Sequence, residues 1–93
     1  MKILVVCGSG LGSSLMMEMS IKSIIKELGI EGEVNHTDLG SAKGLGADIF
    51  IGTRDITSQL EHVDGEVISL KNMIDKAYMK SELEATFKKL GVL

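Results

Sequence analysis

The sequence predicts one α/β domain built around a parallel β-sheet. Two observations support this fold class. Residues 2–6 and 47–52 are mostly apolar, which is typical of strands that are buried on both faces. Strand-like and helix-like segments also alternate along the chain, and this alternation favours parallel strands joined by helical crossovers. We therefore expect helices on both faces of the sheet.

The first half of the chain predicts a strand, a helix and an edge strand. Residues 2–6 are aliphatic after Lys2, and residues 33–37 alternate weakly between apolar and polar side chains. Residues 13–28 are predicted to form a helix that stops at Gly29. Its apolar residues recur at spacings of three and four: Met17, Ile21, Ile24, Ile25 and Leu28.

The second half predicts two more strands and two more helices. A glycine-containing loop at residues 40–46 leads to the second apolar strand, at residues 47–52. We expect a short helix at residues 56–60, a fourth strand at residues 66–70 and a closing helix at residues 72–90. The apolar residues of the closing helix are Met73, Ala77, Leu83, Phe87 and Leu90.

These elements predict a three-layer, Rossmann-like sandwich with a four-stranded parallel sheet. Right-handed crossovers around a central first strand give the strand order 2-1-3-4. In such sheets ligands bind beyond the carboxyl ends of the strands, where the winding reverses. The end of the first strand, at residue 7, is therefore the predicted site.

Composition narrows the class of protein. The 93 residues, 44% of them hydrophobic, suffice for one domain over residues 1–93. A net charge of −3 without a basic block disfavours nucleic acid and an anionic membrane surface as partners. No apolar stretch approaches the roughly 20 residues that span a bilayer, so direct membrane insertion is not expected. One cysteine and no signal-peptide pattern predict a cytoplasmic protein with a reduced thiol.

Cys7 ends the first strand and is followed by glycines and serines. Glycine allows a tight turn that points backbone N–H groups inward, and the following helix adds the positive end of its dipole. No acidic residue precedes Glu18, so the segment is predicted to bind an external anion. A thiol placed there should ionise easily and attack phosphorus. The predicted phosphoryl-binding loop consists of Gly8, Ser9, Gly10, Leu11, Gly12, Ser13 and Ser14.

The same stretch also has two other interpretations. A lone cysteine is often a small buried hydrophobe. Glycine-rich turns also bind nucleotides, but the pattern G-x-G-x-x-G and the lysine of a P-loop are both missing. A catalytic Cys7 is therefore preferred.

The stretch VVCGSGLGSSLMM, with weaker support from GADIFIGTRDI and SLKNMID, resembles the IIB components of the bacterial phosphoenolpyruvate-dependent sugar phosphotransferase system. The resemblance is greatest to the ascorbate-specific branch. It implies that a IIA protein passes a phosphoryl group from phosphohistidine to Cys7. It also implies that Cys7 passes this group to a sugar in the membrane transporter IIC, with the IIB protein a monomer at the membrane periphery and without a cofactor.

A small cysteine phosphatase or arsenate reductase is the first alternative function. Phosphatases of the low-molecular-weight tyrosine type place an arginine six residues after the cysteine, where this chain has Ser13. A hydrolase also needs a general acid, for which Asp38 and Asp55 are weak candidates. The second alternative is a non-catalytic, IIB-like regulatory domain.

Partner docking is predicted at Met16, Met19 and Arg54. Not all the methionines near the start of the helix can face the core, and flexible apolar side chains suit docking to two partners in turn. Arg54 and Thr53 should emerge at the same edge of the sheet as Cys7. His36 and His62 lack metal-ligand spacing, so they are interpreted as surface residues and no metal site is expected.

Overall fold

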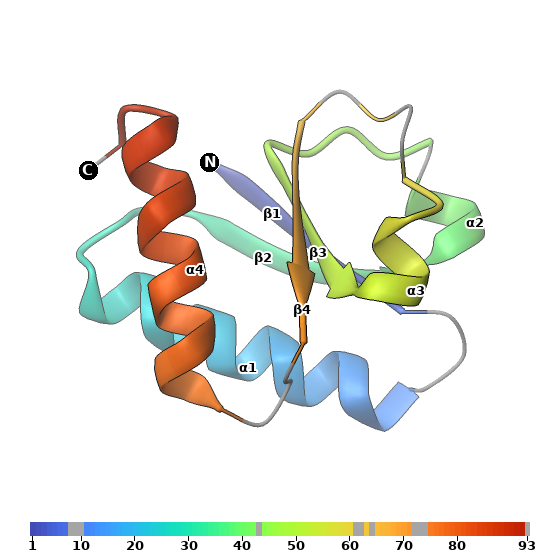
Figure 1. Cartoon of the computed structure of the whole chain (residues 1–93), viewed down its shortest axis with the longest axis horizontal. Helices are drawn as coiled ribbons and strands as arrows, with labels where there is room; N and C mark the ends of the chain where they lie inside the picture. Colours follow the sequence, from blue (N-terminus) through green and yellow to red (C-terminus); the bar gives the residue numbers. More distant parts are fainter. Residues whose placement is uncertain (8–10, 43, 61–62, 64, 72–74, 93) are drawn as a thin grey trace.

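Four parallel strands form one sheet in the order β2-β1-β3-β4, which confirms the predicted topology (Figure 1). The computed structural model describes residues 1–7, 11–42, 44–60, 63, 65–71 and 75–92, and only the backbone of residues 7 and 11–14. The strands are β1 (Lys2–Cys7), β2 (Glu33–Asp38), β3 (Ile49–Thr53) and β4 (Glu66–Leu70), and the helices are α1 (Leu11–Glu27), α2 (Leu39–Ala42), α3 (Arg54–Thr57) and α4 (Lys76–Lys89).

Helices cover both faces of the sheet, as predicted. Successive residues of β1 point to opposite faces, so Ile3 and Val5 pack under the long helices α1 and α4. Leu4 and Val6 pack on the other face with Ala42 and the residues around α3. Figure 1 shows the same division, with α1 and α4 on one side and α2 and α3 on the other.

The apolar stripe of α1 fits its prediction closely. Met17, Ile21, Ile24 and Ile25 are all buried, and Gly29 has a positive φ of 71° after the helix, as expected of a C-terminal stop. The helix begins at Leu11, two residues before the predicted start. Termination was thus easier to predict than initiation.

The segment predicted as a loop at residues 40–46 contains the short helix α2, so that prediction was wrong in part. The backbone N–H of Ser41 donates to Asp38 Oδ1 at 2.6 Å, which satisfies one of the free donors at the start of a helix. Ala42 is fully buried against the sheet. These two contacts outweigh the glycines that favoured a loop.

The helix predicted at residues 56–60 begins earlier, at Arg54, and ends at Thr57. Gly52 of β3 allows this helix to pack closely. A Cβ at position 52 would lie 2.9 Å from the carbonyl oxygen of Val6 and 3.3 Å from Ile56 Cγ2. Only a residue without a side chain fits between β1 and α3 at this point.

The closing helix α4 also begins later than predicted. Residues 72–74 lie outside the described residues, and Asp75 has extended backbone and accepts a hydrogen bond from the N–H of Tyr78 at 3.1 Å. Asp75 is therefore the N-cap, and the helix begins at Lys76. Of the predicted stripe, Leu83 and Phe87 are buried, Ala77 and Leu90 are exposed, and Met73 lies outside the described residues. Met79, which was not predicted, is buried as well.

Candidate functional site

The predicted site residues lie at the carboxyl edge of the sheet. β1 ends at Cys7, whose register partner is Asp38, the last residue of β2. β3 ends at Thr53, opposite Leu70 at the end of β4. Because all four strands are parallel, these ends meet at one edge, beside the start of α3 (Figure 1).

A short connection joins Cys7 to the N-terminus of α1. Three residues, 8–10, separate the end of β1 from Leu11. Consecutive Cα atoms are 3.8 Å apart, so four peptide units place the Cα atoms of residues 7 and 11 no more than about 15 Å apart. The first turn of α1 contains no acidic residue, so no fixed negative charge occupies the positive end of the helix dipole. Of the predicted phosphoryl-binding loop, Gly8, Ser9 and Gly10 lie outside the described residues, and Leu11, Gly12, Ser13 and Ser14 form the first turn of α1.

Asp38 and Asp55 both lie at the carboxyl edge and are both stabilised as carboxylates. The hydrogen bond from the Ser41 backbone N–H lowers the pKa of Asp38 below its ordinary value. The hydroxyl of Thr53 donates to Asp55 Oδ1 at 2.5 Å and lowers the pKa of Asp55 in the same way. A general acid needs a pKa near the working pH, so neither carboxyl group suits that role.

Arg54 and Lys71 add positive charge at the same edge. Arg54 begins α3 and is exposed, and Lys71 follows the end of β4. Neither side chain forms a salt bridge with any carboxylate of the described residues. Sequence reasoning missed Lys71, although its position directly after a predicted strand was a usable signal. Both cations are available to an anionic partner.

The first two turns of α1 carry an exposed apolar surface. Leu15, Met16 and Met19 are 50%, 64% and 63% exposed, whereas Met17 between them is 1% exposed. The prediction that methionines near the cysteine would be exposed therefore holds for Met16 and Met19. We call these three exposed residues the α1 apolar surface.

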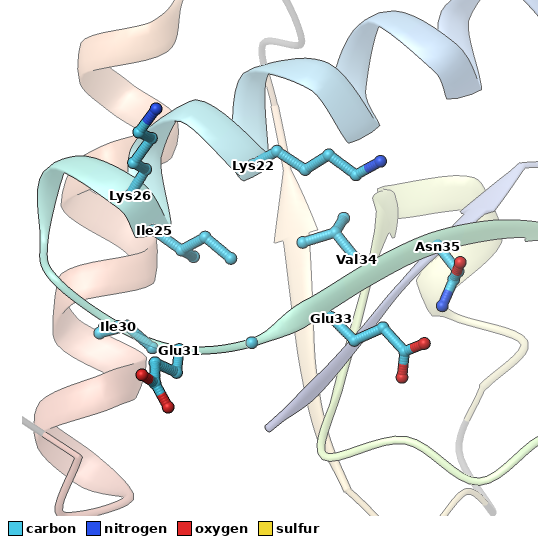
Figure 2. A pocket seen from close by; sticks show the side chains of 9 residues that line it. Lys22, Ile25, Lys26, Ile30, Glu31, Glu33, Val34 and Asn35 are labelled. Carbon is cyan, nitrogen blue, oxygen red and sulfur yellow. The ribbon is translucent and has the colours of Figure 1, made fainter.

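Among the described residues, two of the surface hollows lie away from this edge. Figure 2 shows the first, between the C-terminal half of α1 and the start of β2, with Ile25, Ile30 and Val34 on its apolar side. The second is lined by residues at the amino ends of β3 and β4, among them Asp48 and Glu66. Neither of these two hollows includes a predicted site residue.

Two further predictions concern metals and membranes. The described residues contain no group of three or more metal-ligating side chains. His36 forms a hydrogen bond with Glu18, and His62 lies outside the described residues. Within the described part of the chain, no helix is both long enough and apolar enough to cross a bilayer.

Comparison with known proteins supplies the family. The model of the lactose/cellobiose-specific IIB subunits of the phosphotransferase system (PTS) matches residues 2–85. The chain belongs to this family. The resemblance seen in the sequence is confirmed, and PTS IIB proteins are phosphotransferases that take part in sugar uptake.

Two relatives of this IIB chain are ascorbate-specific PTS system EIIB components. The one from Mycoplasma pneumoniae is 30% identical over 84 residues, covering 87% of this chain and 88% of the relative. The one from Escherichia coli O157:H7 is 33% identical over 79 residues, covering 82% and 78%.

Among solved structures, a lactose-specific IIB component domain from Streptococcus pneumoniae has the same fold as this IIB chain. The two superpose with a TM-score of 0.65 at 17% identity, over 95% of each chain. This likeness agrees with the three-layer α/β architecture and the strand order of the IIB chain.

Proposed function

We propose that this IIB protein carries a phosphoryl group on Cys7. The observation that carries the proposal is the position of Cys7 at the carboxyl end of the central strand β1, four residues before the start of a long helix with no acidic residue in its first turn. The backbone N–H groups of such a helix bind phosphate well. In this proposal residues 8–14 bind the phosphoryl group.

The relay consists of two displacements at phosphorus. The Cys7 thiolate attacks the phosphohistidine of a IIA protein; the S–P bond forms, the P–N bond breaks, and the leaving imidazole nitrogen takes up a proton. A sugar hydroxyl in the IIC transporter then attacks the phosphocysteine. The O–P bond forms, the S–P bond breaks, the hydroxyl proton passes to a base, and the thiolate is restored. Uncharged backbone donors stabilise the group in transit without trapping it.

Ascorbate is the proposed sugar. The relatives at 30% and 33% identity are ascorbate-specific, whereas the lactose-specific domain shares only 17% of its residues with this chain. IIC supplies the sugar pocket in this proposal, so the IIB protein works at the cytoplasmic side of the membrane, next to the transporter.

The α1 apolar surface is the proposed docking site for IIA. Met16 and Met19 are exposed on the helix that follows Cys7, and an apolar patch centred on an interface is typical of partner contacts. Arg54, without a carboxylate partner among the described residues, would meet an acidic rim on IIA.

The carboxyl edge supports a carrier over a phosphatase. The lowered pKa values of Asp38 and Asp55 favour their carboxylate form over the protonated form that a general acid needs, and Ser13 stands where a phosphatase of this type has arginine. A phosphocysteine in this loop should therefore persist until an acceptor binds.

The test is the intact mass of the protein after incubation with phosphoenolpyruvate, the general phosphotransferase proteins and an ascorbate-type IIA. We expect the unaltered protein to gain one thiol-linked phosphoryl group, and the Cys7→Ser variant to gain none. No gain in the presence of phosphorylated IIA would contradict the proposal. Hydrolysis of p-nitrophenyl phosphate or reduction of arsenate by the protein alone would then support the alternative enzyme.

A further inference from the structure

Glu18 is a charged side chain that the fold buries. It is only 7% exposed and is the one charged residue among the described residues with so little exposure. Its Oε2 lies 2.8 Å from Nδ1 of His36, and its Oε1 lies 3.5 Å from Nζ of Lys22. Because a carboxylate accepts, His36 Nδ1 carries the proton of this hydrogen bond.

The Glu18–His36 bond joins two elements close to the candidate site. Glu18 lies in the second turn of α1, next to the buried Met17, and these are the first buried side chains described in this helix. His36 lies in the edge strand β2, in register with Val5 and two residues before Asp38. The bond therefore links α1 to β2 at the half of the helix that is nearer Cys7.

Besides His36 and Lys22, no charged side chain of the described residues pairs with Glu18. α1 packs on β1, β2 and α4. β1 and α4 contribute apolar residues to the shared core, while Lys76 and Lys80 of α4 bind Glu27, more than two turns away. Lys22 extends along α1 above β2 in Figure 2. Among the described residues, His36 and Lys22 are thus the groups that balance the Glu18 carboxylate.

A buried carboxylate is a costly way to attach a helix. Apolar residues of similar volume often stabilise a protein as well or better, because a buried charge must be desolvated. Apolar packing, however, has no preferred direction, whereas a hydrogen bond of 2.8 Å fixes distance and angle. We propose that Glu18 and His36 are positioning residues, which hold the N-terminus of α1 against β1 so that the Cys7 thiolate and the incoming phosphoryl group meet the N–H groups of α1.

This role rests on the proposed phosphoryl transfer, but its first test is independent of it. A cysteine near a helix N-terminus ionises at lower pH than a free thiol. The rate of Cys7 alkylation by iodoacetamide, followed against pH by intact mass, therefore reports how closely α1 approaches the thiol. His36→Leu removes the hydrogen bond, and His36→Asn retains a donor near the position of Nδ1. Asn35→Leu is the matched control, since Asn35 is an exposed neighbour in the same strand.

We expect His36→Leu to shift the ionisation of Cys7 to higher pH and to slow its alkylation at pH 7 about threefold or more. Asn35→Leu and His36→Asn should stay within about twofold of the unaltered protein. A His36→Leu rate equal to that of Asn35→Leu would overturn the positioning role.

Because His36→Leu leaves a buried carboxylate with only Lys22, the double variant Glu18→Met, His36→Leu keeps the test valid if the single variant unfolds. Its thermal midpoint should be close to that of the unaltered protein while its alkylation remains slow.

The second test measures phosphorylation by phosphorylated IIA. The double variant should show a maximal rate lowered about threefold or more, in line with the alkylation result, while the IIA concentration that gives half of this rate is unchanged. If the unaltered protein accepts no phosphoryl group, the proposed function fails while the alkylation result stands. If it accepts one and the double variant does so equally fast, the positioning role alone is wrong.

Discussion

The two halves of α1 differ in what they contact and in what they leave exposed. The C-terminal half buries Ile21, Ile24 and Ile25 and binds α4 through Glu27. The N-terminal half begins beside the cysteine without an acidic residue and exposes the α1 apolar surface. The two halves of this helix therefore differ in their roles. Its second half holds the fold together, and its first half is the part that we propose meets an anion and a partner.

The largest effect should come from the buried C-terminal half. Ile24→Ala removes a fully buried side chain and should lower the free energy of unfolding by about 2 to 5 kcal/mol, because a cavity remains in the core. Urea denaturation measures this loss, with the exposed Lys26→Ala as the control. Well below the unfolding temperature, the rate of Cys7 phosphorylation should be unchanged; a proportional fall in rate would mean that the two halves are not separable.

In the N-terminal half, Ser13→Asp should affect function and stability in opposite directions. Ser13 lies in the first turn of α1, where a carboxylate is favoured by the helix dipole by about 0.3 to 1 kcal/mol. The same charge should repel an incoming phosphoryl group by about 1 to 3 kcal/mol, or roughly five- to 150-fold in rate. Intact-mass kinetics with Ser13→Asn as the neutral control measure the effect. Undiminished phosphorylation of Ser13→Asp would argue against an anion site at this end of the helix.

A smaller functional effect is expected from the α1 apolar surface. Met16→Glu and Met19→Glu should each slow phosphorylation by IIA roughly fivefold, equivalent to about 1 kcal/mol of lost contact. The thermal midpoint should stay constant because both side chains are exposed. Ser81→Glu, on the exposed part of α4, adds the same charge at a distance. Equal phosphorylation rates for Met16→Glu, Met19→Glu and Ser81→Glu would show that IIA does not dock on the α1 apolar surface.

The smallest effect concerns the acid stability that Glu27 contributes. A hydrogen bond and the charge of Lys76 lower the pKa of Glu27 below 4.5. A folded-state pKa below the unfolded value adds stability at neutral pH, and this stability is lost as the pH falls from about 4.5 through the folded-state pKa. Glu27→Gln should therefore flatten the decline of unfolding free energy on acidification. Urea titrations at pH 3 to 7 test this, and an unaltered slope would mean that the pair is fully screened by solvent.

The sequence predicted the sheet better than the short helices. Apolar runs such as residues 2–6 can only be central strands in a chain of this size, and the strand order followed from crossover rules. α2 was missed because its stability comes from the Asp38 cap and from burial of Ala42. Both are contacts with other elements of the fold, and the sequence pattern within residues 39–42 does not indicate them.

The candidate site also has one part that the sequence indicates and one part that depends on contacts between distant residues. The role of Cys7 and its loop stays a prediction, and it could be made from the sequence because the order of cysteine, glycine and serine indicates the chemistry. The contact between Glu18 and His36 joins residues that are distant in the chain, so spacing alone could not reveal it. One signal was available, since Glu18 stands three residues before Ile21 and seven before Ile25, within the buried stripe. A charge in that position predicts a partner on the element beneath.

The close approach at Gly52 has a consequence for how this protein can vary. A methyl group at position 52 would collide with the backbone of Val6, the residue directly before Cys7. Positions 52 and 7 are far apart in the chain. The space available at position 52 nevertheless limits where the backbone of Val6, and therefore of Cys7, can lie. Substitution of Gly52 on β3 should therefore alter the reactivity of the cysteine without changing the residues of its loop. In related chains we expect the residues at these two positions to vary together rather than separately.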